Sequence, residues 1–447
     1  MGSMVEISFA GRPGEGTRFS LYPQSPLLVE YRTPVVVELS PRNGTVDVGP
    51  NDGRVCVIRP LGKAGSYGEL MLARSMAKPL LPPWRGRVAD PARADSYGHF
   101  DHLEPQDPAF AQAHAYACVR LTLDVWERYL GRRIPWQFAS GMRWLEVGLL
   151  DHYPNGECSW GGWLELGADV RPDRPPHPFA LNLDVVAHEV GHLIVYSLVG
   201  LPPATDFAEY AGFQEAAADL VALLVSAQLS PVVEEVLKRT RGNLYVANEL
   251  NRLGELSSNT QIRQASNAAK MSEFALGWSD EHDLSEPLTG AVFDLLVDMY
   301  QWELVQRGLI PPSLDRMVHE VGHLRPFGPS IQAEYDRCYP ADPPGFRMAL
   351  AAACDRLGAY LAYVLTHLHA DRLSYLAVRA TLQQADLELG GGRFAGAIAE
   401  NFAWREIGRV GIGPYLGAVG GIPSSLHLGV HRCAQRALPS HRDIGQA

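Results

Sequence analysis

The sequence predicts an α+β protein with a β-rich N-terminal region and a mainly helical C-terminal part. In the first hundred residues, short β-prone runs alternate with turns rich in Gly, Pro and Asn. Further along, apolar residues recur at helical spacing, and after Leu288 nearly every segment has this pattern. A chain of 447 residues with 46% hydrophobic content is too long for one typical domain, so we expect two or three lobes.

Residues 1–104 are expected to form an additional β-rich region. Turn sequences such as Asn51-Asp52-Gly53 separate its β-prone runs, and the Pro-rich stretch 80–93 marks its end. The expected strands are 27–31, 35–39 and 55–58.

Residues 105–200 are expected to form an α/β lobe. A helix over 110–130 is predicted by apolar spacing and ended by Gly131, and a second long helix over 183–199 is ended by Gly200 and Pro202. Between them we expect strands at 144–150 and 163–166, and a Pro-rich loop at 171–178.

Residues 201–447 are expected to form a mainly helical lobe. The predicted helices, taken in order, are 213–229, 290–307, 312–323, 346–369 and 370–385.

Charge and composition exclude several classes of function. The chain has 39 basic and 50 acidic residues, a net charge of −11, which disfavours binding to nucleic acid or to an anionic membrane. Its longest apolar stretches, such as 220–229, are shorter than the ~20 residues that span a bilayer. With no secretory signal and six cysteines lacking a Cys-x-x-Cys, we expect free thiols and a cytoplasmic protein.

The pentapeptide His188-Glu189-Val190-Gly191-His192 predicts a zinc site. Residues four apart lie on one face of a helix, so the two imidazoles can bind one Zn²⁺. Glu189 projects at another angle and is placed to take a proton from an attacking water. The surrounding helix is apolar on nearly every side, and two histidines and a glutamate buried there need a partner.

A third ligand is expected from the next predicted helix. Catalytic zinc takes three protein ligands and leaves one position open. Glu215 follows His192 after enough residues for a loop and a return helix, and small apolar residues surround it. Asp219 lies one turn later on the same face, where it can accept the second ring N–H of a zinc-bound histidine.

Around these residues the chain resembles the thermolysin-like zinc metallopeptidases, whose third ligand is a glutamate. The resemblance covers roughly residues 105–300. It rests on Asp184–Glu189, Gln214–Asp219, Ala113–Tyr116 with Tyr129–Arg132, Asn155–Gly167, and His282-Asp283-Leu284-Ser285. It implies a two-lobe thermolysin-like fold with zinc between a β-containing and a helical lobe.

The resemblance also implies roles for residues outside the zinc motif. His282 matches the histidine that donates to the oxyanion, with Asp280 or Asp283 orienting its ring. The strand at 155–167 matches the edge strand that pairs with extended substrate, and Trp160 is a substrate-binding candidate there. Tyr210 is a candidate oxyanion donor, although its spacing to Glu215 is shorter than in the family, and Arg263 is a candidate for the arginine that grips substrate. The sequence has no acidic cluster where the family binds calcium, so calcium is not predicted.

A second copy of the pentapeptide, His319-Glu320-Val321-Gly322-His323, is expected to be structural. Pro326 disfavours helix at the preceding residue, so His323 would lie at a helix end. No acidic pair on an apolar helix follows it. His99 and His102 are expected to be loop residues.

The leading function is peptide hydrolysis by a zinc metallopeptidase. The alternative is another zinc chemistry on the same scaffold, acting on a small amide or other small molecule in a biosynthetic pathway, because a fold does not determine a substrate. A binding module with structural zinc is a third possibility, against which Glu189 argues. The sequence does not determine the oligomeric state.

Overall fold

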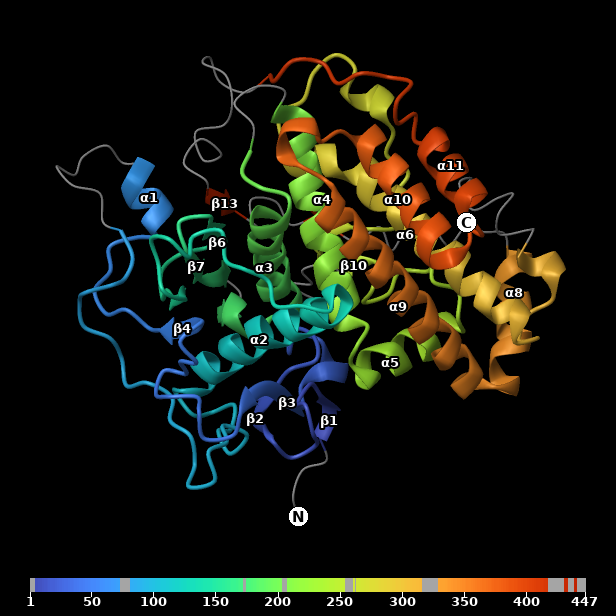
Figure 1. The fold of residues 1–447 in the computed structure, drawn as a ribbon. Helices are drawn as coiled ribbons and strands as arrows, with labels where there is room; N and C mark the ends of the chain where they lie inside the picture. The colour runs from blue at the N-terminus through green and yellow to red at the C-terminus, as the bar shows by residue number, and fades with distance from the viewer. Residues whose placement is uncertain are drawn as a thin grey trace. The chain divides into compact units, whose positions relative to one another are not determined.

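The structure is a computed structural model that describes residues 5–72, 81–171, 174–202, 207–253, 260–261, 263–315, 329–416, 430–432 and 438–439 (Figure 1). The chain divides into two compact units. The first consists of Met1–Leu198, Gly254–Ile262 and Ile422–Ala437, and the second of Val199–Leu253, Arg263–Gly421 and Leu438–Ala447.

A three-stranded sheet opens the first unit. Its strands are β1 (Val5–Ser8), β2 (Gly16–Leu21) and β3 (Val35–Arg42), with β3 in the middle, parallel to β1 and antiparallel to β2. The strand expected at 35–39 is confirmed as part of β3. The strand expected at 27–31 is wrong, because Val29–Tyr31 forms a 3₁₀ helix (η1) after a turn in which Leu28 N–H donates to Ser25 O.

A five-stranded sheet, in the order β13-β6-β7-β5-β4, is the centre of the first unit. Strands β4 (Val55–Ile58), β5 (Leu145–Leu149) and β7 (Trp163–Leu166) are parallel to one another. The sequence predicted where these three strands lie in the chain, but not how they pair. Strand β6 (Gly156–Ser159) is antiparallel to β7 on one side and to β13 (Val430–Arg432) on the other. The sequence did not predict β13.

The Pro-rich loop expected at 171–178 is also wrong. Strands β8 (Ala168–Arg171) and β9 (Arg174–Pro178) form an antiparallel ribbon. Proline lacks a backbone donor, but each strand of a two-stranded ribbon has only one partner, so prolines are tolerated where the missing N–H would face outward.

Two helices pack against this sheet and against each other: α2 (Phe110–Leu130) and α3 (Leu183–Leu198). Gly131 ends α2 in the left-handed conformation with φ 64°, as glycine commonly does. Asn182 Oδ1 accepts from the N–H groups of Asp184 and Val185 and so caps the start of α3. The short helix α1 (Tyr67–Leu72) precedes them.

A buried histidine fixes α2 in place. His114 Nε2 accepts from Tyr22 N–H at 2.9 Å, and its Nδ1 lies 2.8 Å from Ala180 O. A backbone N–H can only donate and a carbonyl only accept, so the ring is neutral with its proton on Nδ1. Burial lowers the pKa of His114 to about 3.

The second unit is mainly helical. Helix α6 (Glu281–Gln306) packs against α4 (Phe207–Ser226), α9 (Pro343–His367) and α11 (Ala395–Trp404). This unit also contains the helices α5 (Ser230–Thr240), α8 (Pro329–Cys338) and α10 (Tyr375–Gly390). Its short 3₁₀ helices are η3 (Met271–Phe274), η4 (Tyr339–Ala341) and η5 (Ala370–Arg372). Two short strands, β10 (Arg252–Leu253) and β12 (Arg263–Gln264), pair with each other. Two further two-residue strands are β11 (Thr260–Gln261), which belongs to the first unit, and β14 (Leu438–Pro439), which belongs to the second.

The helix expected at 213–229 begins six residues earlier, at Phe207, and ends at Ser226. The helix expected at 290–307 begins at Glu281, so it includes His282 in its first turn. Pro287 lies inside this helix, at its seventh residue, so the helix continues past a position that cannot donate a backbone hydrogen bond. Helix α9 is long and apolar enough to cross a bilayer, but 61% of its most apolar window is buried in this structure, as in a core helix.

Candidate metal centre

Helix α3 brings His188 and His192 together. They are one helical turn apart, both buried, and their Nε2 atoms are 3.0 Å apart with the ring planes at 89°. Four donors arranged tetrahedrally at 2.0–2.1 Å from zinc are separated by about 3.3 Å. The two imidazoles therefore already have nearly the spacing that one zinc ion requires.

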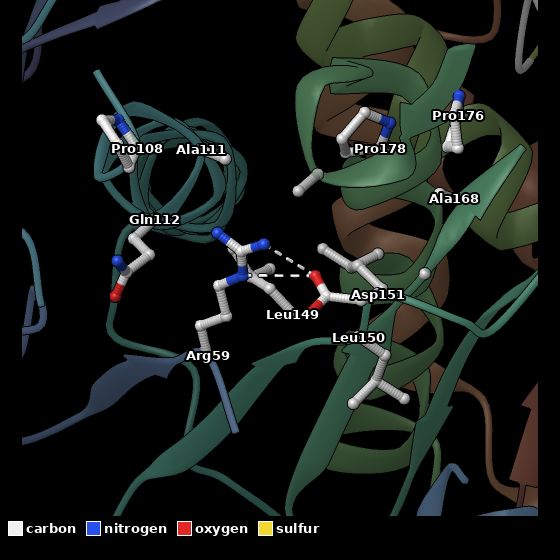
Figure 2. Close-up of a pocket in the computed structure, with 13 residues that line it drawn as sticks. Arg59, Pro108, Ala111, Gln112, Leu149, Leu150, Asp151, Ala168, Pro176 and Pro178 are labelled. Carbon is white, nitrogen blue, oxygen red and sulfur yellow. Dashed lines mark hydrogen bonds and ion pairs between the residues drawn. The ribbon is translucent and has the colours of Figure 1, made fainter. Parts of the chain in front are cut away.

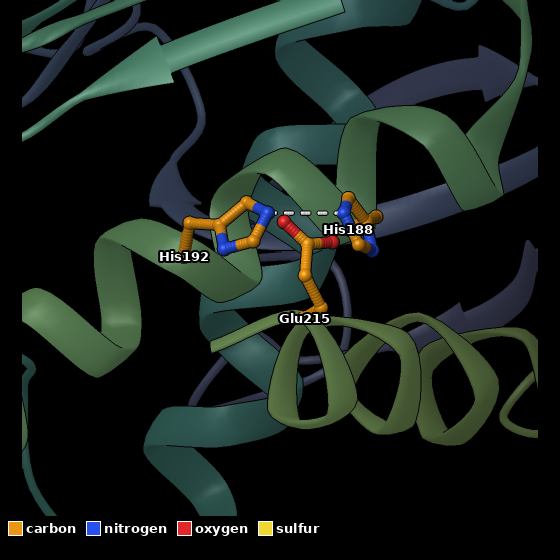
Figure 3. A group of neighbouring side chains, drawn as sticks. All are labelled: His188, His192 and Glu215. Carbon is orange, nitrogen blue, oxygen red and sulfur yellow. Dashed lines mark hydrogen bonds between the residues drawn. The ribbon is translucent and has the colours of Figure 1, made fainter. Parts of the chain in front are cut away.

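Glu215 supplies the third donor. Ligand atoms of His188, His192 and Glu215 all lie within 4.8 Å of one another, and all three residues are buried. Figure 3 shows the Glu215 carboxylate directed toward the two facing imidazole nitrogens. Two imidazoles and one carboxylate form a donor set of the type that catalytic zinc uses, so these residues fit a metal ion.

Glu189 lies against β6 of the five-stranded sheet. Its side chain is fully buried, and a Cβ built on Gly156, in β6, would lie 3.5 Å from Glu189 Oε1. A Cβ there would make an ordinary van der Waals contact, so β6 and the Glu189 carboxylate are direct neighbours.

Asp219 and Arg263 form a buried ion pair. Arg263 Nη2 lies 2.7 Å from Asp219 Oδ1 and its Nε 2.8 Å from Oδ2, while its Nη1 lies 3.9 Å from Glu215 Oε2. The sequence predicted an imidazole as the partner of Asp219 and a substrate carbonyl as the partner of Arg263. The ion pair between them was missed, because residues 44 positions apart give no local signal.

His282 lies at the start of α6, held by Asp280. The Asp280 carboxylate caps the helix by accepting from His282 N–H at 3.0 Å, and the same oxygen is 2.7 Å from His282 Nδ1. Of the two aspartates expected to orient the ring, Asp280 does so. His282 Nε2 lies 3.5 Å from Glu215 Oε2. Burial lowers the pKa of His282, but the carboxylates of Glu215 and Asp280 outweigh it and raise the pKa to about 9.

Tyr210 and Trp160 make contacts of their own. The Tyr210 hydroxyl donates to Gly200 O at 2.7 Å and accepts from Gln214 Nε2 at 2.9 Å, so a role toward an oxyanion would require it to leave Gly200. The Trp160 ring meets Tyr196 edge to face, with centroids 5.4 Å apart. Their catalytic and substrate-binding roles stay predictions.

His99 is not part of this group. His99 Nδ1 accepts from Arg18 N–H at 3.2 Å, which is a structural role in a loop. The second pentapeptide, His319–His323, lies outside the described residues.

A buried polar group on the sheet also escaped prediction. Glu146, Glu157 and Glu165, one on each of β5, β6 and β7, are buried, and Lys63 pairs with Glu165. Burial raises the pKa of Glu165 to about 7 despite this partner. Glu157 accepts from Gly68 N–H and Glu165 from Tyr67 N–H, so the group fastens the start of α1. In the sequence these glutamates alternate with apolar residues, which is typical of a solvated strand face.

A pocket of about 310 Å³ in the first unit is lined by none of the predicted site residues. Figure 2 shows it between α2 and the strands around β8 and β9, with the ion pair of Arg59 and Asp151 (2.8 Å) inside an otherwise mainly apolar lining.

Comparison with known proteins identifies no family. No protein-family model matches the sequence, and no curated protein matches it. Among solved structures, the chain is similar to the precursor of protealysin, a metalloproteinase from Serratia proteamaculans, with a TM-score of 0.38 and 16% identity over 73% of this chain and 84% of that one. A likeness at this level does not establish what this chain does.

Proposed function

We propose that this protein is a zinc-dependent hydrolase, and that its substrates contain peptide bonds. The observation that carries the proposal is the buried group of two imidazoles and a carboxylate, in which His188 and His192 already have nearly the spacing of zinc ligands. A structural zinc site would use four protein ligands. Among the described residues this group has three, which leaves a position for water or substrate.

Each residue has a defined task in this reaction. When bound by His188, His192 and Glu215, zinc would polarise a substrate carbonyl and lower the pKa of a water molecule to near 7. Glu189 accepts the proton of the attacking water and passes it to the leaving nitrogen. His282, oriented by Asp280, donates from Nε2 to the developing oxyanion.

One observation favours the alternative, a small amide. Strand β13 pairs with the outer edge of β6, so that edge is covered in this structure. A small molecule does not need a free sheet edge, whereas an extended peptide commonly uses one.

Metal analysis of the parent and of two histidine variants tests the proposal. We expect about one zinc per chain in the parent and in His319→Ala, and none in His188→Ala, because the second pentapeptide lacks the third ligand. His319→Ala is a matched control, since it changes the same position of an identical motif. Zinc that persists in His188→Ala, or a parent that takes up no zinc on titration, contradicts the proposal.

Glu189→Gln separates metal binding from catalysis. This variant should retain zinc and lose hydrolysis of both peptides and small amides, because the base is not a ligand. Hydrolysis at the parental rate would show that Glu189 does not activate water.

A further inference from the structure

Strand β6 has a partner that comes from the far end of the chain. Val430, His431 and Arg432 of β13 lie opposite Ser159, Cys158 and Glu157 in an antiparallel pairing. Without β13, β6 would be the last strand of the sheet, with a row of backbone N–H and C=O groups open to another chain. The C-terminal segment therefore occupies a position where any extended peptide could pair.

The strand that carries this edge packs against α3, the helix of the proposed catalytic base, within one compact unit. Helix α3 packs against β6, and the β6 backbone at Gly156 approaches both the Glu189 carboxylate and the Val185 side chain, each 3.5 Å from a Cβ built there. A strand paired with β6 lies ~4.8 Å from it. The pairing of β13 with β6 ends at Glu157, the residue next to Gly156, so a strand on this edge passes the part of β6 that contacts Glu189.

We infer that β13 is an intramolecular competitor at the outer edge of β6, and that an extended peptide must displace it in order to pair there. The inference rests on the proposed function for the identity of the ligand as substrate. The paired segment is only three residues long, against a typical strand of about five to six. A tethered strand competes at an effective concentration of the order of mM, so a peptide that pairs over more residues can replace it.

Two adjacent proline substitutions in the full chain test the pairing. In an antiparallel pair, alternate residues direct their N–H groups toward the partner strand and away from it. Proline removes an N–H, and an edge strand tolerates it where that N–H faces outward. Of Val430→Pro and His431→Pro, one therefore breaks a hydrogen bond to β6, and the other is its matched control.

The readout is the binding of a fluorescent peptide with the sequence of residues 428–434 (serine in place of Cys433), measured with Glu189→Gln also present so that no turnover occurs. The bond-breaking variant should bind this peptide at least about ten-fold more tightly than the parent does, because the tethered competitor is weakened. The control variant should bind it as weakly as the parent. Equal affinity in all three proteins, or an equal gain in both proline variants, overturns the inference.

Hydrolysis by the same proline variants, with Glu189 intact, separates this inference from the proposed function. The bond-breaking variant should show a lower KM for a peptide of eight residues and an unchanged KM for a blocked dipeptide. Suppose that the zinc-loaded parent hydrolyses the dipeptide but that neither proline substitution changes peptide binding. The proposed hydrolase function is then supported, and the inference that β13 must be displaced is wrong. If no variant hydrolyses anything, the proposed function fails, and the binding measurement still decides whether the edge takes a peptide.

Discussion

Replacing Arg263 with methionine distinguishes a structural role from a substrate-binding role for this residue. Its guanidinium makes two close contacts with Asp219, at 2.7 and 2.8 Å, and the exposed fractions of the two side chains are 7% and 2%. Methionine preserves much of the apolar stem and removes the charge, which leaves the Asp219 carboxylate buried without its cation.

The expected loss of stability is large. Removing one partner of a buried ion pair typically costs about 3–5 kcal/mol, because the other charge remains buried. For a domain of about 150–250 residues each kcal/mol lowers Tm by roughly 2–4 °C, so Arg263→Met should lower the Tm of the second unit by about 6–20 °C. Arg263→Lys should lose less, since it keeps the charge and loses the two-pronged contact. In the double variant Arg263→Met/Asp219→Leu most of the loss should be recovered, because neither charge of the pair remains.

Calorimetry, zinc titration and steady-state kinetics on these variants show whether Arg263 stabilises the fold or binds substrate. Zinc affinity should not fall in Arg263→Met, because the cation removed lies 3.9 Å from the Glu215 carboxylate and opposes a second cation there. A Tm within about 2 °C of the parent, combined with a lower kcat/KM, would refute this reasoning and show that Arg263 acts on substrate.

Three further predictions concern metal binding, catalysis and pH. Glu215→Ala should weaken zinc binding by more than the ~10–100-fold that loss of an outer-shell partner causes, and zinc titration showing an unchanged affinity would remove it from the ligand set. His282→Ala should keep zinc and lower kcat by ~10²–10³, and an effect confined to KM would instead indicate ground-state binding. The pKa of His114 is lowered from 6.5 to about 3 in the folded protein, so its contribution to stability is complete above pH 6.5 and is lost as the pH falls toward 3. Between pH 8 and pH 5 this single group should account for about 2 kcal/mol of lost stability. Calorimetry at both pH values should therefore show a smaller acid destabilisation in His114→Gln than in the parent, and equal losses would contradict the assignment.

The sequence alone determined the elements whose signal is local. Helix α2 was predicted to the residue and α3 to within one, because apolar spacing and a terminal glycine lie within the helix itself. The pairing of His188 with His192 follows from the i, i+4 geometry of any helix, so no tertiary information was needed. Asp280 was likewise within reach of prediction, since it is two residues from His282.

Only the tertiary structure decided the contacts between residues far apart in the chain. The ion pair of Asp219 with Arg263 and the pairing of β13 with β6 join segments whose local sequences do not reveal each other. The buried glutamates of the sheet, Glu157 and Glu165 among them, look like a solvated face until Lys63 and α1 are placed over them. Burial and ion pairing depend on which groups the folded chain brings together, and helical or strand periodicity records only which residues share a face.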